Sequence, residues 1–213
     1  MQNKIFTKIY GWMFLGLLIS FITGYYVSTN ENMLYNIFQT GTYWILAIIE
    51  IVVVIWLSAG IRKMNIVTAR TLYILYSILT GLTLSSIFLA YKIGSIIYVF
   101  GFTSIMFAIM AILGKTTKLD LTKLGTILFV GLLGIVIASI INIFVGSQTF
   151  DLVLCIIGII IFTAYIAYDV NKIKYTLEYL EEDKVAIIGA FELYLDFINL
   201  FIKLLRLFGK RDD

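Results

Sequence analysis

Long apolar runs constrain this chain more than any other feature. A helix that crosses the roughly 30 Å hydrocarbon core of a bilayer needs about 20 apolar residues. Seven such stretches occur, at Ile9–Val27, Gly41–Ala59, Ile66–Ala90, Ile93–Leu113, Leu121–Val145, Leu152–Lys172 and Val185–Phe208. These runs are continuous, whereas the strands of a membrane β-barrel alternate over about ten residues. The sequence therefore predicts an all-α membrane protein with seven transmembrane helices.

The composition supports this class and limits the chemistry. Charged residues make up 14% of the 213 residues, against about 25% in a typical soluble domain. The segments between the apolar runs are short, so we expect a single integral membrane domain over residues 1–213, surrounded by lipid and without a nucleic-acid partner. Histidine is absent and Cys155 is the one cysteine, which excludes a disulfide framework and a thiolate metal site. No organic cofactor is expected.

The basic residues predict an orientation. If the seven helices alternate in direction, most lysines and arginines before residue 185 fall on one side, and the opposite loops hold only Lys92. The positive-inside rule then places the N-terminus in the cytoplasm of a multi-pass cell-membrane protein. The basic tail after Leu200 conflicts with this pattern. Either the last segment spans fully and its tail lies outside, which we favour, or it re-enters and ends inside.

A polar stripe marks the last apolar run. It consists of residues spaced 4, 3, 4 and 3 apart, which fall on one face of a helix: Glu192, Asp196, Asn199, Lys203 and Arg206. A charge near the bilayer centre costs about 2.5–3.5 kcal/mol on insertion scales, so this face should meet protein or water. The stripe predicts an interior helix, with Lys203 and Arg206 as anchors near the far interface.

The sixth run supplies a partner for this stripe in Asp169. The midpoint between Asp169 and Asp196 falls between Glu182 and Asp183, in the polar turn that joins the last two runs. Each aspartate is about 13 residues from that midpoint, or roughly 20 Å along a helix. In an antiparallel hairpin the two carboxyl groups lie at equal depth and can face each other.

Two carboxylates in contact in a low-dielectric interior must share a proton or hold a cation. Ca²⁺ prefers six to eight oxygen ligands, so the two aspartates would need carbonyls or waters to complete its shell. Protons and Ca²⁺ should therefore compete at Asp169 and Asp196. The alternative is a hydrogen bond that only pins the two helices together.

Glu50 is a further acidic residue inside an apolar run, and two interpretations remain for it. One is a protonated carboxyl that hydrogen-bonds to a neighbouring helix; the other is a carboxylate that lines an ion path. We assign Glu50 and Glu192 to the ion pathway.

Two strings in the last two runs, "AYDVNKIK" (167–174) and "LYLDFINLFIKLLRLFG" (193–209), resemble the signature of the Bax inhibitor family, especially its bacterial pH-sensitive calcium-leak type. The resemblance implies a C-terminal helix enclosed by the other six, and a pH sensor at Asp169 and Asp196. It also implies a Ca²⁺ leak that opens when the second helix rearranges, with its acidic residue at Glu50. A basic latch is implied after that helix, at Arg62 or, as the reserve, Lys63.

Two other functions compete with a pH-sensitive calcium leak channel. An intramembrane aspartyl protease also uses two acids, but Asp196 lacks flanking glycine and the chain has no proline for the expected Pro-Ala-Leu element. We therefore expect that the protein is not an enzyme. A non-conducting regulator that binds another membrane protein is the other alternative.

Overall fold

The computed structural model describes residues 2–61, 63–176 and 181–212. Most of these residues lie in helices, which short connections join. Seven of its helices are long and apolar enough to cross a membrane, which confirms the predicted class. They are α1 (Gln2–Ser28), α3 (Thr42–Gly60), α4 (Ile66–Ala90), α5 (Ile93–Thr116), α6 (Thr122–Val145), α7 (Gln148–Thr176) and α8 (Glu182–Phe208).

Several helices are longer than the apolar runs that predict them, because they continue into the polar residues that flank each run. The bounds of α4 agree with the prediction, and Asn65 fixes its start because the Asn65 side chain accepts a hydrogen bond from the Thr68 N–H at 2.8 Å. By contrast, α1 begins at Gln2 rather than Ile9. Hydropathy reports where hydrocarbon begins, whereas a helix continues until its backbone finds a cap.

The connection between α1 and α3 differs from the short polar loop that the sequence predicts. It contains a short helix, α2 (Glu31–Leu34), and a π-helical turn, η1 (Tyr35–Gln39). Asn30 starts α2, because its side chain accepts the Met33 N–H at 3.1 Å. Gly41 then takes the left-handed conformation, with φ 77°, just before α3 begins.

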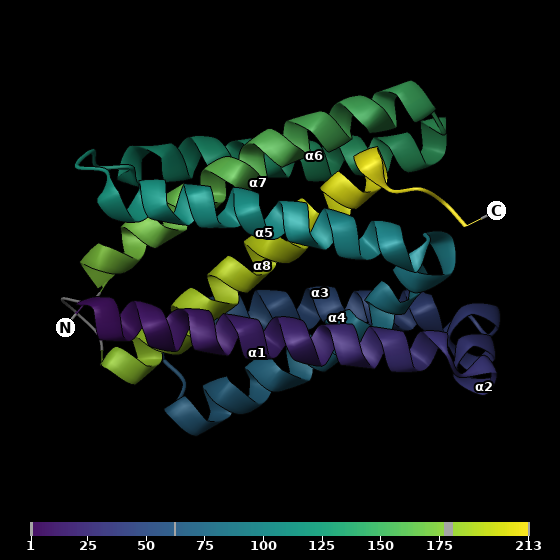
Figure 1. Cartoon of the computed structure of the whole chain (residues 1–213), viewed down its shortest axis with the longest axis horizontal. Helices are drawn as coiled ribbons and strands as arrows, with labels where there is room; N and C mark the ends of the chain where they lie inside the picture. The colour runs from purple at the N-terminus through teal and green to yellow at the C-terminus, as the bar shows by residue number, and fades with distance from the viewer. Residues whose placement is uncertain (1, 62, 177–180, 213) are drawn as a thin grey trace. The chain divides into compact units, whose positions relative to one another are not determined.

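The chain forms two compact units, and the first comprises Met1–Lys92, Leu180–Phe191 and Arg211–Asp213. Within it α1 lies along α4 (Figure 1). Small residues permit this approach: a Cβ on Gly81 would lie 2.7 Å from the Ser20 carbonyl oxygen. The Ser20 hydroxyl also lies 2.7 Å from the Ser77 carbonyl oxygen. Close approach of the backbones and interhelical hydrogen bonds usually stabilise helix pairs in lipid.

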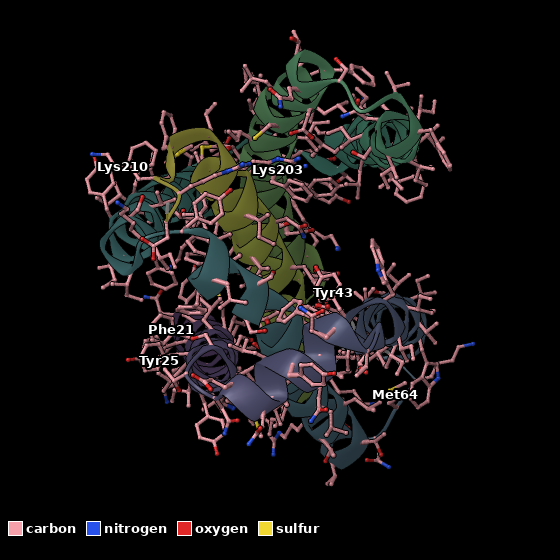
Figure 2. All side chains as sticks on the ribbon, turned by 90° about the vertical axis from the view of Figure 1, so that its right-hand side faces the viewer. Phe21, Tyr25, Tyr43, Met64, Lys203 and Lys210 are labelled. Carbon is pink, nitrogen blue, oxygen red and sulfur yellow. The ribbon has the colours of Figure 1, made fainter. Side chains whose placement is uncertain are left out.

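Aromatic contacts complete the packing of the first unit. On α1 the rings of Phe21 and Tyr25, labelled in Figure 2, stack at 6.3 Å. Both rings also meet the edge of Phe88 on α4. Phe191, at the end of the α8 segment in this unit, contacts Tyr76 on α4 edge-on at 5.4 Å.

An ionic cluster holds the start of α8 in the same unit. Asp183 accepts hydrogen bonds from Lys8 on α1 at 2.8 Å and from Arg70 on α4 at 3.0 Å. The Arg70 guanidinium also lies over the Trp12 ring. These side chains are about half exposed, so the cluster orients α8 more than it stabilises the fold.

The second unit comprises Ile93–Tyr179 and Glu192–Lys210. In it α7 lies along both α5 and α6 (Figure 1). At Gly114 on α5, an added Cβ would lie 2.9 Å from the Ala167 Cα on α7, so glycine is required for this approach. Phe197 on α8 packs edge-on against Phe100 and Phe107 of α5.

Helix α8 is the most buried span of the described chain. Within its most apolar window 72% of residues are buried, against 39% or less in every other span. This burial agrees with the interior helix that the polar stripe predicts. Its enclosure by all six other helices, and the grouping of residues 1–213 into a single domain, stay predictions.

The same helix bears on the two alternatives for the C-terminal segment. It continues unbroken for 27 residues, or about 40 Å, which is long enough for a full span. The favoured alternative therefore has a helix of the right length. The side on which the tail lies stays a prediction.

The packing of α1 on α4 yields a test of stability. We expect Gly81→Leu to destabilise the protein by about 1–3 kcal/mol, because the new side chain collides with the α1 backbone. Thermal unfolding in detergent, followed by the loss of monodisperse protein, measures the effect. Gly134→Leu on α6 is the control, since nothing lies within 4 Å of its Cβ position. Equal melting temperatures for the two variants would contradict this account of the α1–α4 contact.

Candidate ion-binding site

Asp169 on α7 and Asp196 on α8 meet within the second unit. Both are buried, with 6% and 5% of their surfaces exposed. Their carboxyl groups lie within hydrogen-bonding reach of each other. The two aspartates come together as the sequence predicts, but the predicted position of the turn is wrong, because Glu182 and Asp183 lie in the first turn of α8. A role for the pair in pH sensing or metal binding stays a prediction.

One oxygen of this pair lacks a partner. Asp196 Oδ2 is buried and accepts no hydrogen bond from the residues that the structure describes. An unsatisfied buried carboxyl oxygen costs more than an ordinary lost hydrogen bond, because it has also lost its water. A proton, a cation or a water molecule would satisfy it. This orphaned oxygen is the feature by which the pair fits a small positively charged ligand.

Lys172 joins the two aspartates to Glu192. Its ammonium group donates to Asp169 Oδ1 at 3.2 Å and to Glu192 Oε1 at 2.7 Å. It also lies 5.7 Å from the centre of the Tyr168 ring. The site thus gathers three carboxyl groups and one ammonium group, so it carries a charge of −2 when all four are ionised.

The sequence placed Glu192 on the ion pathway but gave Lys172 no role. The available signal was local: Lys172 follows Asp169 by three residues, which places both on one helical face. Tyr165 was also missed. Its phenol lies one turn before Asp169 and close enough to both aspartates to interact with them electrostatically.

Glu50 belongs to the first unit and has partners of its own. Thr80 and Thr83 on α4 donate their hydroxyl protons to Glu50 Oε1 at 2.7 Å and Oε2 at 2.8 Å. These are the neighbouring-helix hydrogen bonds that one interpretation of Glu50 expected. Its protonation and its place on an ion pathway stay predictions.

Lys203 and Arg206 lie further along α8 and have other contacts. Arg206 forms an ion pair with Asp151 on α7, with Nη2 2.5 Å from Oδ2. Lys203, labelled in Figure 2, lays its methylene stem beside Gly158, where an added Cβ would lie 3.1 Å from its Cε. These residues attach α8 to α7 about two to three helical turns beyond Asp196. That position agrees with anchors and not with members of the acidic site.

The structure describes one of the two latch candidates. Arg62 lies outside the described residues. Lys63 is exposed, and its backbone N–H donates to the Gly60 carbonyl oxygen at 2.9 Å. A latching role for Arg62 or Lys63 stays a prediction.

Metal-ligating side chains are sparse in the described part of the chain. No group of three or more histidine, cysteine, aspartate or glutamate side chains is arranged there to hold a metal ion. Asp169 and Asp196 would therefore share any bound cation with backbone or water oxygens, as the sequence suggests for Ca²⁺.

The sequence of this chain matches a known protein family. Residues 2–213 match the model of the family described as "Inhibitor of apoptosis-promoting Bax1". The inner membrane protein YbhL of Escherichia coli K12 is 41% identical over 211 residues, which cover 96% of this chain and 90% of YbhL.

Two other relatives have similar coverage. A protein of Borreliella burgdorferi is 41% identical over 99% of this chain and 93% of its own length. A membrane protein of Streptococcus pyogenes serotype M1 is 37% identical over 99% of this chain and 94% of its own length. The match extends through all seven helices and includes both acidic helices of the site, so this chain is an integral membrane protein that belongs to the Bax inhibitor family.

Proposed function

We propose that this protein is a pH-sensitive calcium leak channel in which Asp169 and Asp196 form an intramembrane site for protons or Ca²⁺. One observation carries the proposal: two buried carboxyl groups face each other from α7 and α8, and Asp196 Oδ2 has no partner among the described residues. In this proposal the protein lies in the cell membrane with its N-terminus in the cytoplasm. It is not an enzyme and uses no organic cofactor.

The charges around the pair suggest how the site exchanges ligands. With one proton on the pair, the two aspartates form a hydrogen-bonded clamp between α7 and α8. When that proton leaves, the two carboxylates repel each other, and Lys172 offsets only part of the negative charge of Asp169, Asp196 and Glu192. A divalent cation restores the balance. Ca²⁺ binding should therefore strengthen as the pH rises and the competing protons are removed.

Glu192 and Glu50 would act at different points of the path. Glu192 is partly exposed and pairs with Lys172 next to the aspartates, which suits a carboxylate that passes cations to them. Glu50 and its two threonine donors belong to the other unit, on α3 and α4. Rearrangement of α3 would expose or withdraw this carboxylate. Such movement is easier for α3 than for α8, since only 6% of the α3 window is buried.

The first prediction removes the titrating pair. In the double variant Asp169→Asn and Asp196→Asn, we expect Ca²⁺ flux to lose its dependence on pH, because neither amide can gain or lose a proton in this range. Purified protein in vesicles loaded with a calcium dye provides the measurement. Asp151→Asn is the matched control, since it removes an acid from the same helix whose partner is Arg206.

Three results, from this flux measurement and from two companion assays, would favour another account. An unchanged pH response in the double variant would eliminate the mechanism. Vesicles that stay tight to Ca²⁺ at every pH, with a co-purifying membrane partner, would favour the non-conducting regulator. Cleavage of a transmembrane reporter peptide that stops in Asp196→Asn would favour the protease.

The second prediction tests Lys172 as the internal counter-ion. Lys172→Gln removes the positive charge beside the carboxyl groups, which then hold their protons more tightly. We expect the midpoint of the pH response to move upward by roughly one pH unit. Lys172→Arg keeps the charge and should keep the midpoint. A midpoint that stays in place, or moves downward, in Lys172→Gln would contradict this role.

A further inference from the structure

The accessible side of α8 follows its polar stripe. Most residues of α8 in the second unit are buried up to the last turn of the helix. Those that stay partly or fully accessible between 192 and 206 are Glu192, Leu195, Asn199, Ile202, Lys203 and Arg206. Their spacing places them on one face of the helix. This face carries four of the five residues of the polar stripe, so a narrow polar surface runs along α8 past Asp196.

Unpartnered polar groups follow one another on this surface. Asp196 Oδ2 has no hydrogen-bond partner among the described residues. The Asn199 amide nitrogen donates to the Leu195 carbonyl oxygen at 2.8 Å, while its side-chain oxygen accepts no hydrogen bond in that part of the chain. About one turn further, the Lys203 ammonium group likewise has no hydrogen bond or ion pair to a described residue. Two free oxygens are thus followed by a free positive charge.

The Lys203 side chain extends back along α8 toward the acidic pair. The Lys203 carbonyl oxygen accepts a hydrogen bond from the Cys155 thiol on α7 at 3.0 Å. The stem then passes Gly158, where an added Cβ would lie 3.5 Å from Cγ, 3.3 Å from Cδ and 3.1 Å from Cε. Gly158 is about one turn closer than Cys155 to Asp169 along α7. This is also the direction in which a helical side chain leaves its backbone.

An interfacial anchor does not require this arrangement. A lysine that only anchors a helix extends its ammonium group outward to water. Arg206, three residues further along α8, already attaches this end of the helix through its ion pair with α7. The stem of Lys203 instead occupies the space that Gly158 leaves free. The anchoring role therefore accounts for the position of Lys203 in the sequence but not for the direction of its side chain.

The charge of Lys203 has no ion partner of its own in the described chain. The charged groups that act on it are Asp151 and Arg206. These two pair with each other at 2.5 Å, so the Asp151 charge is already balanced. The charges that act most strongly on Asp196 are instead those of the acidic site. The polar stripe thus has an acidic part around Asp196 and a positive part around Lys203.

We propose that Lys203 is a specificity-determining residue whose ammonium group repels cations on the far side of Asp196. This inference rests on the proposed function, since it requires cations to move along the polar face of α8. Repulsion between two charges scales with their product, so a fixed ammonium group opposes Ca²⁺ twice as strongly as K⁺. Fixed positive charges form barriers to cations in other pores. Lys203 would therefore keep the leak slow and limit its preference for Ca²⁺.

The test compares Lys203→Met with the unaltered chain in vesicles that hold a dye for Ca²⁺ or for K⁺. Methionine keeps an unbranched apolar stem over Gly158 and removes the charge. We expect K⁺ flux to rise about fivefold and Ca²⁺ flux about 25-fold, as for a charge about 4 Å from the ion in water-like surroundings. The pH midpoint should stay in place, because the acidic site is intact. Lys203→Arg keeps the charge and should conduct as the unaltered chain does.

Lys210→Met is the matched control. Lys210, labelled in Figure 2, is exposed beyond the end of α8, where water and salt screen its charge. Its backbone N–H donates to the Ser95 hydroxyl at 2.9 Å, a bond that the substitution leaves in place. Both fluxes should therefore stay unchanged in this variant.

Three outcomes would overturn the proposal. Equal increases of Ca²⁺ and K⁺ flux in Lys203→Met would indicate a loosened helix contact and not a lost charge. Unchanged fluxes in Lys203→Met, together with a normal pH response in the unaltered chain, would refute the role of Lys203 and leave the acidic pair as the proposed site. Vesicles that stay tight with the unaltered chain and with every variant would refute both proposals.

Discussion

A polar group inside a hydrocarbon layer must find its partner within the protein, and this constraint organises the whole chain. The backbone meets it by forming helices. The side chains meet it in pairs: Ser20 with the backbone at Ser77, Glu50 with two threonines, and Asp151 with Arg206. Asp169 and Asp196 meet it only in part, because an acid paired with an acid needs a proton or a cation as well. This incompletely satisfied pair of acids is therefore the place where we expect chemistry.

Helix α8 shows how one amphipathic sequence serves several purposes. Its first segment is attached through Asp183 and Phe191 to α1 and α4. Its middle carries Asp196, and its last turns hold Arg206 against α7. A helix with charged residues along its length is costly in lipid, yet Asp183, Glu192 and Arg206 each have an ion partner on a neighbouring helix. These polar residues of α8 therefore lie where neighbouring helices supply their partners.

Much of this arrangement could be predicted from residue order. Seven apolar runs predict seven spans because hydrocarbon thickness fixes helix length. The meeting of Asp169 with Asp196 could also be predicted, although Glu182 and Asp183, where the sequence places the turn, lie in α8. Lys172 was missed because a lysine near a span end usually extends to the interface. In the structure the Lys172 side chain points toward Glu192 instead. This orientation depends on the rotation of α8 about its axis, which sequence spacing does not report. The π-helical turn after α2 likewise leaves no periodic signal.

The central claim is that protons and Ca²⁺ exchange at one buried acidic pair. Infrared difference spectroscopy of the purified protein tests this most directly, because the carbonyl stretch of a protonated carboxyl group is separate from that of a carboxylate. The account predicts a protonated-carboxyl band at acidic pH that disappears when Ca²⁺ is added and that is missing in Asp196→Asn. The absence of any Ca²⁺-sensitive band, or a Ca²⁺-sensitive band that persists in the double variant Asp169→Asn and Asp196→Asn, would contradict it.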